Sequence, residues 1–224
     1  MEKPLIKSLC LKTIYKGIIR PYLQLVVGIQ YPDCSFLKDE KQFVIIANHN
    51  SHLDTLSLLT SLPGDILWKV RPVAAEDYFG NTKLKAKLSN FFINTLLINR
   101  RSKKTNGAND AMDKMLKAID DGYSLILFPE GSRGEPEQMS KLKSGIARLL
   151  AQRPGLKYVL VYMTGMGTSL PKGGMVVLPY NATLHFEQPV LPESTDSYAI
   201  MDQIENHFNR MVEQYGIKEE EDDD

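Results

Sequence analysis

The sequence has little of several features that mark specialised protein classes. It holds only two cysteines, Cys10 and Cys34, which are too few for a disulfide framework and favour a reducing, cytoplasmic-side setting. The longest charge-free stretch near the start, 21–32, is far shorter than the ~20 residues of a membrane-spanning helix, so no such helix is predicted. Lysines interrupt the apolar residues before it, which argues against a secretory leader.

The formal net charge is zero, because 27 basic residues balance 27 acidic ones. This balance averages an acidic region and a basic region. Six acids and one base occupy residues 218–224, which we predict to be an acidic disordered tail. Nine bases and two acids lie between Lys69 and Lys104, and this local excess attracts phosphates, anionic lipids or nucleic acid. Charge alone does not choose among these partners.

The composition is that of one globular domain with a core, since 43% of the 224 residues are hydrophobic and 24% are charged. Runs rich in β-branched and aromatic residues predict strands at 43–47, 70–75, 94–98, 124–128, 158–162 and 182–186. Helical patterns occupy 53–61, 84–91, 109–121, 144–152 and 197–215. This alternation predicts an α/β domain over 33–217, with a mostly parallel central sheet flanked by helices.

Residues 1–32 form a predicted N-terminal amphipathic helical segment. Large aliphatic residues recur there at helical spacing and basic residues punctuate them: Leu5, Leu9, Ile14, Ile18, Leu25 and Val26 against Lys3, Lys7, Lys12, Lys16 and Arg20. Such a helix can lie in a bilayer interface, or it can simply pack on the core as a terminal helix. The chemistry of the site favours the membrane interface.

The first polar block, 48–54, follows the first predicted core strand, where function gathers in parallel sheets. On one continuous helix His49 and Asp54 would lie about 140° apart, so a loop histidine and an aspartate in the first helical turn are needed to bring them together. The carboxylate would then orient a neutral imidazole that accepts a proton near neutral pH. The alternative is a structural loop histidine beside a helix-capping aspartate.

The second polar block, 128–134, follows the fourth predicted strand. Arg133 offers a planar fork for phosphate or carboxylate oxygens, Gly131 lets the backbone approach a ligand, and Glu130 can brace an arginine or receive substrate hydroxyls. A plain turn with a surface salt bridge is the alternative. The chain has no Gly-x-Ser-x-Gly nucleophile elbow, so a histidine base would activate a hydroxyl of the substrate.

Three ordered motifs carry a family resemblance: Asn48-His49-x-Ser51-x-x-Asp54, Ile98-x-Arg100, and Phe128-Pro129-Glu130-Gly131-x-Arg133. In this order and at these spacings the sequence resembles the glycerolipid acyltransferase superfamily, whose type members are the 1-acylglycerol-3-phosphate acyltransferases. The ordered motifs span roughly residues 44–165.

The resemblance implies acyl transfer from acyl-CoA or acyl carrier protein to the hydroxyl of a lyso-lipid, most simply 1-acylglycerol-3-phosphate, at the cytoplasmic side of a membrane. It implies His49 as general base and Asp54 as its orienting partner, without an acyl-enzyme, a metal or another cofactor. The acceptor's head group would be bound by residues of the later motifs: Arg100, Glu130, Gly131, Ser132 and Arg133.

One departure from the family pattern concerns the acceptor's phosphate. Many members carry a phosphate-binding lysine where this sequence has no lysine, in residues 73–77. Candidates to replace it are Lys69, Arg71, Arg101 and Lys143. Otherwise the acceptor is a different lyso-lipid, such as an acylated amino acid.

Two other classes of function compete with this interpretation. His49, His52 and Asp54 would supply two imidazoles and a carboxylate to a metal-dependent hydrolase, although metal sites normally need further ligands. The basic stretch alone would also suit a non-catalytic protein that binds membranes or nucleic acid.

Overall fold

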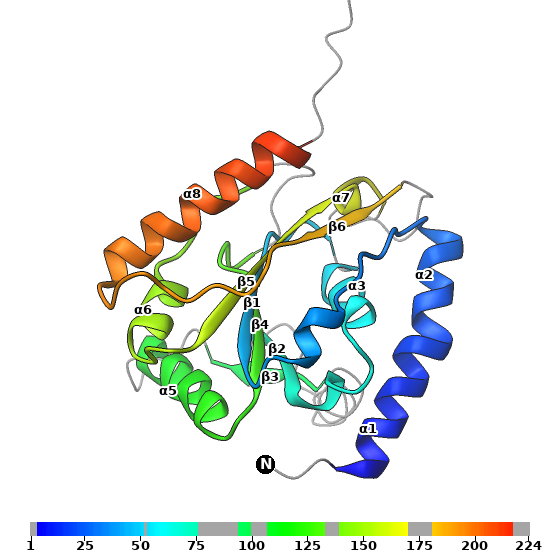
Figure 1. The fold of residues 1–224 in the computed structure, drawn as a ribbon, viewed down its shortest axis with the longest axis horizontal. Coiled ribbons are helices and arrows are strands. Elements are labelled where there is room, and N and C mark those ends of the chain that lie inside the picture. Colours follow the sequence, from blue (N-terminus) through cyan, green and yellow to red (C-terminus); the bar gives the residue numbers. More distant parts are fainter. Residues whose placement is uncertain are drawn as a thin grey trace, which may run out of the picture.

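The computed structural model describes residues 4–51, 53–75, 94–99, 107–132, 139–169 and 181–216. The described strands form one sheet in the order β3-β2-β4-β1-β5-β6 (Figure 1). Their bounds are β1 Phe43–Ala47, β2 Val70–Ala75, β3 Leu96–Ile98, β4 Ser124–Leu127, β5 Lys157–Thr164 and β6 Thr183–Phe186. Strand β6 runs antiparallel to β5 and the other pairings are parallel, so the predicted α/β fold with a mostly parallel sheet is confirmed.

Helices cover both faces of the sheet. Their bounds are α1 Leu5–Lys12, η1 Thr13–Ile19, α2 Arg20–Val26, η2 Ser35–Lys38, α3 Asp54–Ser61, η3 Leu67–Lys69, α5 Gly107–Asp120, α6 Gly145–Ala151, α7 Met166–Ser169 and α8 Ser197–Tyr215. Helices α5, α6 and α8 lie on one side of the sheet, and α3 lies on the other with α1 and α2 beyond it (Figure 1).

Strand β1 is buried on both faces and divides its side chains between two cores. Phe43 and Ile45 belong to the core that includes the N-terminal helices and α3. Val44 and Ile46 point the other way, into the core formed with α5, α6 and α8. This is why the sequence of β1 reads as an uninterrupted apolar run, as expected for a central parallel strand.

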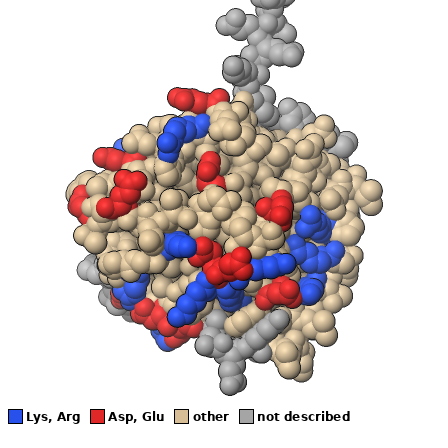
Figure 2. Space-filling view, in the orientation of Figure 1, with Lys and Arg blue, Asp and Glu red and all other residues tan. Residues whose placement is uncertain are grey.

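The helices α1, η1 and α2 follow one another without a break, and we call residues 5–26 the N-terminal arm (Figure 1). The arm contacts η3 and α3, and its buried side chains Leu11, Tyr15 and Leu23 join the core on that side of the sheet. No described helix is both long and apolar enough to cross a membrane. The outer margin of the molecule beside α2 is largely uncharged in Figure 2.

Most predicted elements occur within one or two residues of their expected bounds, and one difference has a clear cause. The third strand begins at Leu96 rather than at Asn94, because Asn94 adopts a left-handed backbone with φ of 55°. The amide of Asn94 donates to the carbonyls of Trp68 and Val70, at 2.9 and 3.0 Å, and so fastens the start of β3 to that of β2. The helix predicted at 84–91 and the tail at 218–224 lie outside the described residues.

Candidate active site

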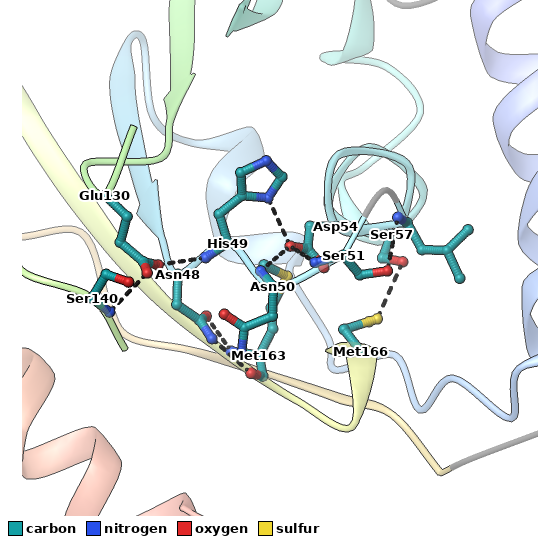
Figure 3. A network of polar contacts seen from close by, with 11 residues as sticks. Asn48, His49, Asn50, Ser51, Asp54, Ser57, Glu130, Ser140, Met163 and Met166 are labelled. Atoms are coloured by element: carbon teal, nitrogen blue, oxygen red, sulfur yellow. Dashed lines mark hydrogen bonds and ion pairs between the residues drawn. The ribbon is translucent and has the colours of Figure 1, made fainter. Parts of the chain in front are cut away.

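The site lies at the carboxyl edge of the sheet, beyond β1 and β4. These strands are parallel neighbours, with Ile46 opposite Leu127, so the two polar blocks that follow them emerge side by side. The first begins with Asn48 and His49, and the second contains Phe128 and Glu130. Figure 3 shows Glu130 reaching the main chain at His49 from the neighbouring loop.

His49 and Asp54 form a hydrogen-bonded pair, as the sequence analysis required. Nδ1 of His49 lies 2.8 Å from Oδ2 of Asp54. The same oxygen accepts the backbone N–H groups of Asn50 at 2.7 Å and Ser51 at 2.9 Å, so the chain curls around the carboxylate (Figure 3). Helix α3 begins at Asp54, and its positive end adds to the stabilisation of an ionised carboxylate.

The two members of the pair differ in exposure, and this difference suits proton transfer. The Asp54 side chain is fully buried, whereas the His49 side chain retains 21% of its exposure. Because the Asp54 carboxylate can only accept a hydrogen bond, Nδ1 of the neutral His49 ring must carry the hydrogen. Nε2 is then the hydrogen-bond acceptor of the ring. The histidine side chain is therefore partly exposed, and Nε2 is its basic nitrogen. The alternative in which Asp54 caps the helix is not what the structure shows, because Leu53 is the N-cap residue of α3 and no side-chain hydrogen bond caps this helix.

Glu130 holds the main chain on both sides of the site. Oε1 accepts the backbone N–H of His49 at 2.7 Å, and Oε2 accepts that of Ser140 at 2.8 Å. The residue is only 3% exposed, and this burial raises the pKa of its carboxyl group, against the effect of the two backbone hydrogen bonds. The contact to His49 was not predicted, because nothing in the sequence indicates which main-chain groups a loop carboxylate will meet.

Two further residues hold the histidine in place. The ring of Phe128 stacks on the imidazole, with centroids 4.2 Å apart and planes inclined by 22°. Asn48 extends the pairing of β1 beyond its last residue, because its side-chain amide donates to the Met163 carbonyl at 2.8 Å and accepts the Met163 N–H at 2.7 Å. Both lie in the polar blocks that the sequence indicated, but their contacts were not predicted.

The turn after β4 brings one candidate cation close to the site. Gly131 has a left-handed φ of 77°, and its N–H closes the turn on the Phe128 carbonyl at 3.0 Å. The Lys143 N–H donates to the Pro129 carbonyl at 2.9 Å. Its ammonium group lies so close to Gly131 that a Cβ at that glycine would collide with Nζ. Ser132, next in the chain, is exposed.

Two other candidate cations lie at the opposite edge of the sheet, where the strands begin. Lys69 donates to the carbonyls of Glu40 and Lys41, at 2.8 and 3.0 Å. Arg71 donates to the carbonyls of Asn94 and Thr95. Of the three candidates for the missing lysine that the structure describes, it brings Lys143 to the carboxyl edge and places Lys69 and Arg71 away from it. Arg100, Arg101, Arg133 and His52 lie outside the described residues.

Within the described ranges, no group of three or more histidine, cysteine, aspartate or glutamate side chains is arranged to hold a metal ion. The site therefore consists of an imidazole oriented by a buried carboxylate, next to a glycine turn with a lysine over it. With the parallel sheet, this defines the class: an α/β protein with a histidine–aspartate pair at a strand end.

The comparisons with known proteins identify the family. The model of the acyltransferase family matches residues 29–178, and the chain belongs to this family. The resemblance inferred from the three motifs is thereby confirmed. The 1-acyl-sn-glycerol-3-phosphate acyltransferase of Helicobacter pylori (strain J99) is 28% identical over 116 residues, which are 51% of this chain and 45% of that protein. The matched stretch thus spans less than half of that relative.

The fold has a close counterpart among solved structures. The crystal structure of the 1-acyl-sn-glycerophosphate (LPA) acyltransferase PlsC from Thermotoga maritima superposes with a TM-score of 0.75. The superposition covers 99% of this chain and 86% of that one, with 16% sequence identity. At this identity the likeness establishes the fold alone.

Proposed function

We propose that this protein transfers a fatty acyl group from acyl-CoA or acyl carrier protein to the free hydroxyl of a lyso-lipid, with 1-acylglycerol-3-phosphate as the first acceptor to test. The observation that carries the proposal is the 2.8 Å contact between His49 Nδ1 and the buried Asp54 carboxylate. It supports His49 as an oriented base on a partly exposed side chain. Membership of the acyltransferase family and the names of the two relatives support this choice of reaction and acceptor.

The reaction follows from that geometry. Nε2 of His49 removes the proton from the acceptor hydroxyl as its oxygen attacks the thioester carbonyl carbon. A carbon–oxygen bond forms, and the resulting tetrahedral intermediate collapses as the carbon–sulfur bond breaks. The departing thiolate is then protonated by the imidazolium, which Asp54 stabilises and orients during the reaction. The acyl group passes directly to the acceptor, so no acyl-enzyme is formed.

An anion site beside the base would hold the acceptor's head group. Lys143 supports this role, because its ammonium group lies over the Gly131 turn in the loop next to His49. The backbone of a left-handed glycine turn can approach a ligand closely, and a lysine is a common point charge for phosphate. Arg100, Arg133 and Ser132 are proposed to complete the site from the family motifs.

The N-terminal arm supports a peripheral position on the cytoplasmic side of a membrane. Nine large apolar side chains are exposed among the described residues, and six of them belong to this arm: Leu5, Ile6, Leu9, Ile18, Tyr22 and Leu25. Exposed apolar surface of this extent on one helix is typical of helices that lie in the bilayer interface. A lipid acceptor would reach the site from the same surface.

The decisive experiment supplies labelled acyl-CoA, or labelled acyl carrier protein, together with vesicles that contain candidate lyso-lipids, and identifies the products by mass spectrometry. His49→Ala should lower turnover by about 10²–10⁴-fold, which is the usual contribution of a general base. The control His207→Ala, on α8, should retain activity, and both variants should keep the wild-type circular dichroism spectrum. Acylation at the normal rate by His49→Ala would exclude His49 as the base.

A further inference from the structure

The exposed apolar residues of the N-terminal arm fall into two groups that an ordinary helix would not place together. The first group is Leu5, Ile6 and Leu9, and the second is Ile18, Tyr22 and Leu25. Ile18 lies nine positions after Leu9, and in an uninterrupted α-helix nine steps of about 100° add up to about 900°. The two side chains would then lie on opposite sides of the helix. One group would then face the protein core.

The segment between the two groups explains why both are exposed. Residues Thr13–Ile19 form a π-helix, whose i→i+5 hydrogen bonds place more residues in each turn than an α-helix does. Each residue therefore turns the chain by a smaller angle, and the second group rotates back onto the face of the first. The buried side behaves in the same way, because Leu11 before this segment, Tyr15 within it and Leu23 after it are all almost fully buried.

Three basic residues of the arm contact the protein, and the fourth, Lys12, is exposed and pairs with Asp65 at 3.0 Å. Nζ of Lys16 donates to the Thr60 carbonyl at 2.6 Å, and the Arg20 guanidinium lies 3.4 Å from the same oxygen. Arg20 also lies over the Tyr31 ring, 4.4 Å from its centroid. Nearer the start, Lys7 donates to Oδ1 of Asn94 at 2.6 Å. These contacts fix which side of the arm faces outwards.

The contact at Thr60 connects the arm to the active site. Thr60 lies in the last turn of α3, where unpaired carbonyls and the negative end of the helix favour cations. The first residue of the same eight-residue helix is Asp54, which orients His49. One short helix therefore joins the arm to the catalytic pair.

We propose that the π-helical segment sets how the protein lies on a membrane. It aligns the two apolar groups into one face that contacts a lipid bilayer along the whole arm, while Lys16 and Arg20 keep the opposite side fastened to α3. The orientation of His49 relative to the bilayer surface is thereby fixed. This proposal rests on the membrane position given above, and it adds that both halves of the arm enter the lipid together.

Fluorescent labels on the two halves test this directly. In a Cys10→Ser background, where the remaining Cys34 is only 3% exposed, Leu9→Cys and Leu25→Cys each take an environment-sensitive fluorophore. Tyr198→Cys on α8, outside the arm, serves as the control. Vesicles of phosphatidylcholine with phosphatidylglycerol should shift the emission of both arm labels to the blue and leave the control unchanged.

A shift at only one arm position would overturn the alignment proposal and leave membrane binding intact. A shift at neither would overturn both. Neither result depends on turnover, so failure of the acyltransferase proposal, read from the acylation assay, is a separate outcome.

Inserting one alanine after Gly17 tests the alignment of the two halves, with Gly17→Ala as the matched control. A Cβ at Gly17 meets no atom within 4 Å, so the alanine variant keeps both the fold and the residue count. The inserted residue adds about 100° of rotation between the two halves of the arm. Vesicle binding, measured by sedimentation, should then fall about tenfold or more, since one apolar group leaves the interface, while Gly17→Ala binds like the wild type. A folded insertion variant with wild-type binding would contradict the proposal.

Discussion

At the scale of single residues, the site depends on main-chain hydrogen bonds as much as on the catalytic pair. Glu130 belongs to a family motif and was expected to meet a substrate or an arginine. In the structure each of its oxygens accepts a backbone N–H, one from His49 and one from Ser140. The Glu130 carboxylate therefore fixes the position of the loop that contains His49.

The two roles of Glu130 are distinguished by Glu130→Gln. The glutamine side chain has nearly the same volume, but its NH₂ group faces one of the two backbone N–H donors. Two donors cannot bond to each other, so one hydrogen bond is lost. If Glu130 acts through His49, kcat should fall by about tenfold or more and KM for the acceptor should change little, because only positioning of the base is disturbed. Steady-state kinetics on both substrates measure this. A raised acceptor KM at unchanged kcat would instead indicate direct contact with the acceptor.

In the proposed anion site, Lys143 is the described residue that would distinguish a phosphate-bearing acceptor from other lyso-lipids. Lys143→Met keeps the length of the side chain and removes the charge over the Gly131 turn. We expect KM for 1-acylglycerol-3-phosphate to rise about tenfold, as the loss of one charged hydrogen bond implies, with a smaller effect on a lyso-lipid without phosphate. Lys69→Met, at the opposite edge of the sheet, is the control for non-specific loss of charge. Equal effects on both acceptors would remove Lys143 from the phosphate site.

At the scale of elements, the sequence was informative wherever a regular period was maintained. Strands β1 and β4 were predicted from their apolar runs, and parallel pairing brought His49 beside Glu130, as expected for two loops that follow neighbouring parallel strands. The arm shows where such reasoning fails. A period of 3.6 residues cannot reveal a π-helical segment, and the acceptor of Lys16, the Thr60 carbonyl, lies 44 residues away in the sequence.

The burial of Lys16 between the arm and α3 predicts a pH dependence of stability. Burial lowers the pKa of Lys16 from 10.5 to about 8, with Arg20 nearby contributing in the same direction. Below about pH 8 the Lys16 ammonium group is charged in the folded protein, and its desolvation lowers the stability by the full amount. Between about pH 8 and 10.5 the unfolded chain binds more protons than the folded one. The contribution of Lys16 to stability therefore rises with pH across this interval.

Lys16→Met removes this titration while keeping an unbranched side chain of similar length. The free energy of unfolding of the wild type, relative to that of the variant, should increase as the pH rises from about 8 to 10.5, which means that the wild type becomes relatively more stable. Urea unfolding of both proteins at several pH values in this interval measures the difference. A constant difference would show that Lys16 is not desolvated in the folded protein.

At the scale of the whole molecule, the two faces of the sheet have different tasks. The face covered by α5, α6 and α8 carries one of the two hydrophobic cores. The other face carries α3 and the arm, which exposes six large apolar side chains while Lys7, Lys16 and Arg20 contact the protein. Asp54, which pairs with His49, is the first residue of α3, so the proposed base and the proposed membrane surface lie on the same side of the sheet.

This arrangement predicts that the arm matters only when the acceptor is in a bilayer. Leu9→Gln combined with Leu25→Gln should lower the rate on vesicle-borne lyso-lipid about tenfold or more, because both side chains are exposed and contribute to lipid contact rather than to the core. The rate on a short-chain, water-soluble acceptor should stay within about twofold, and the melting temperature should hardly change, as is usual for surface substitutions. Tyr198→Ser, an equally exposed residue of α8, should leave both rates unchanged. If the double variant loses activity equally on both acceptors, the arm acts on the active site directly and its apolar face is not a membrane surface.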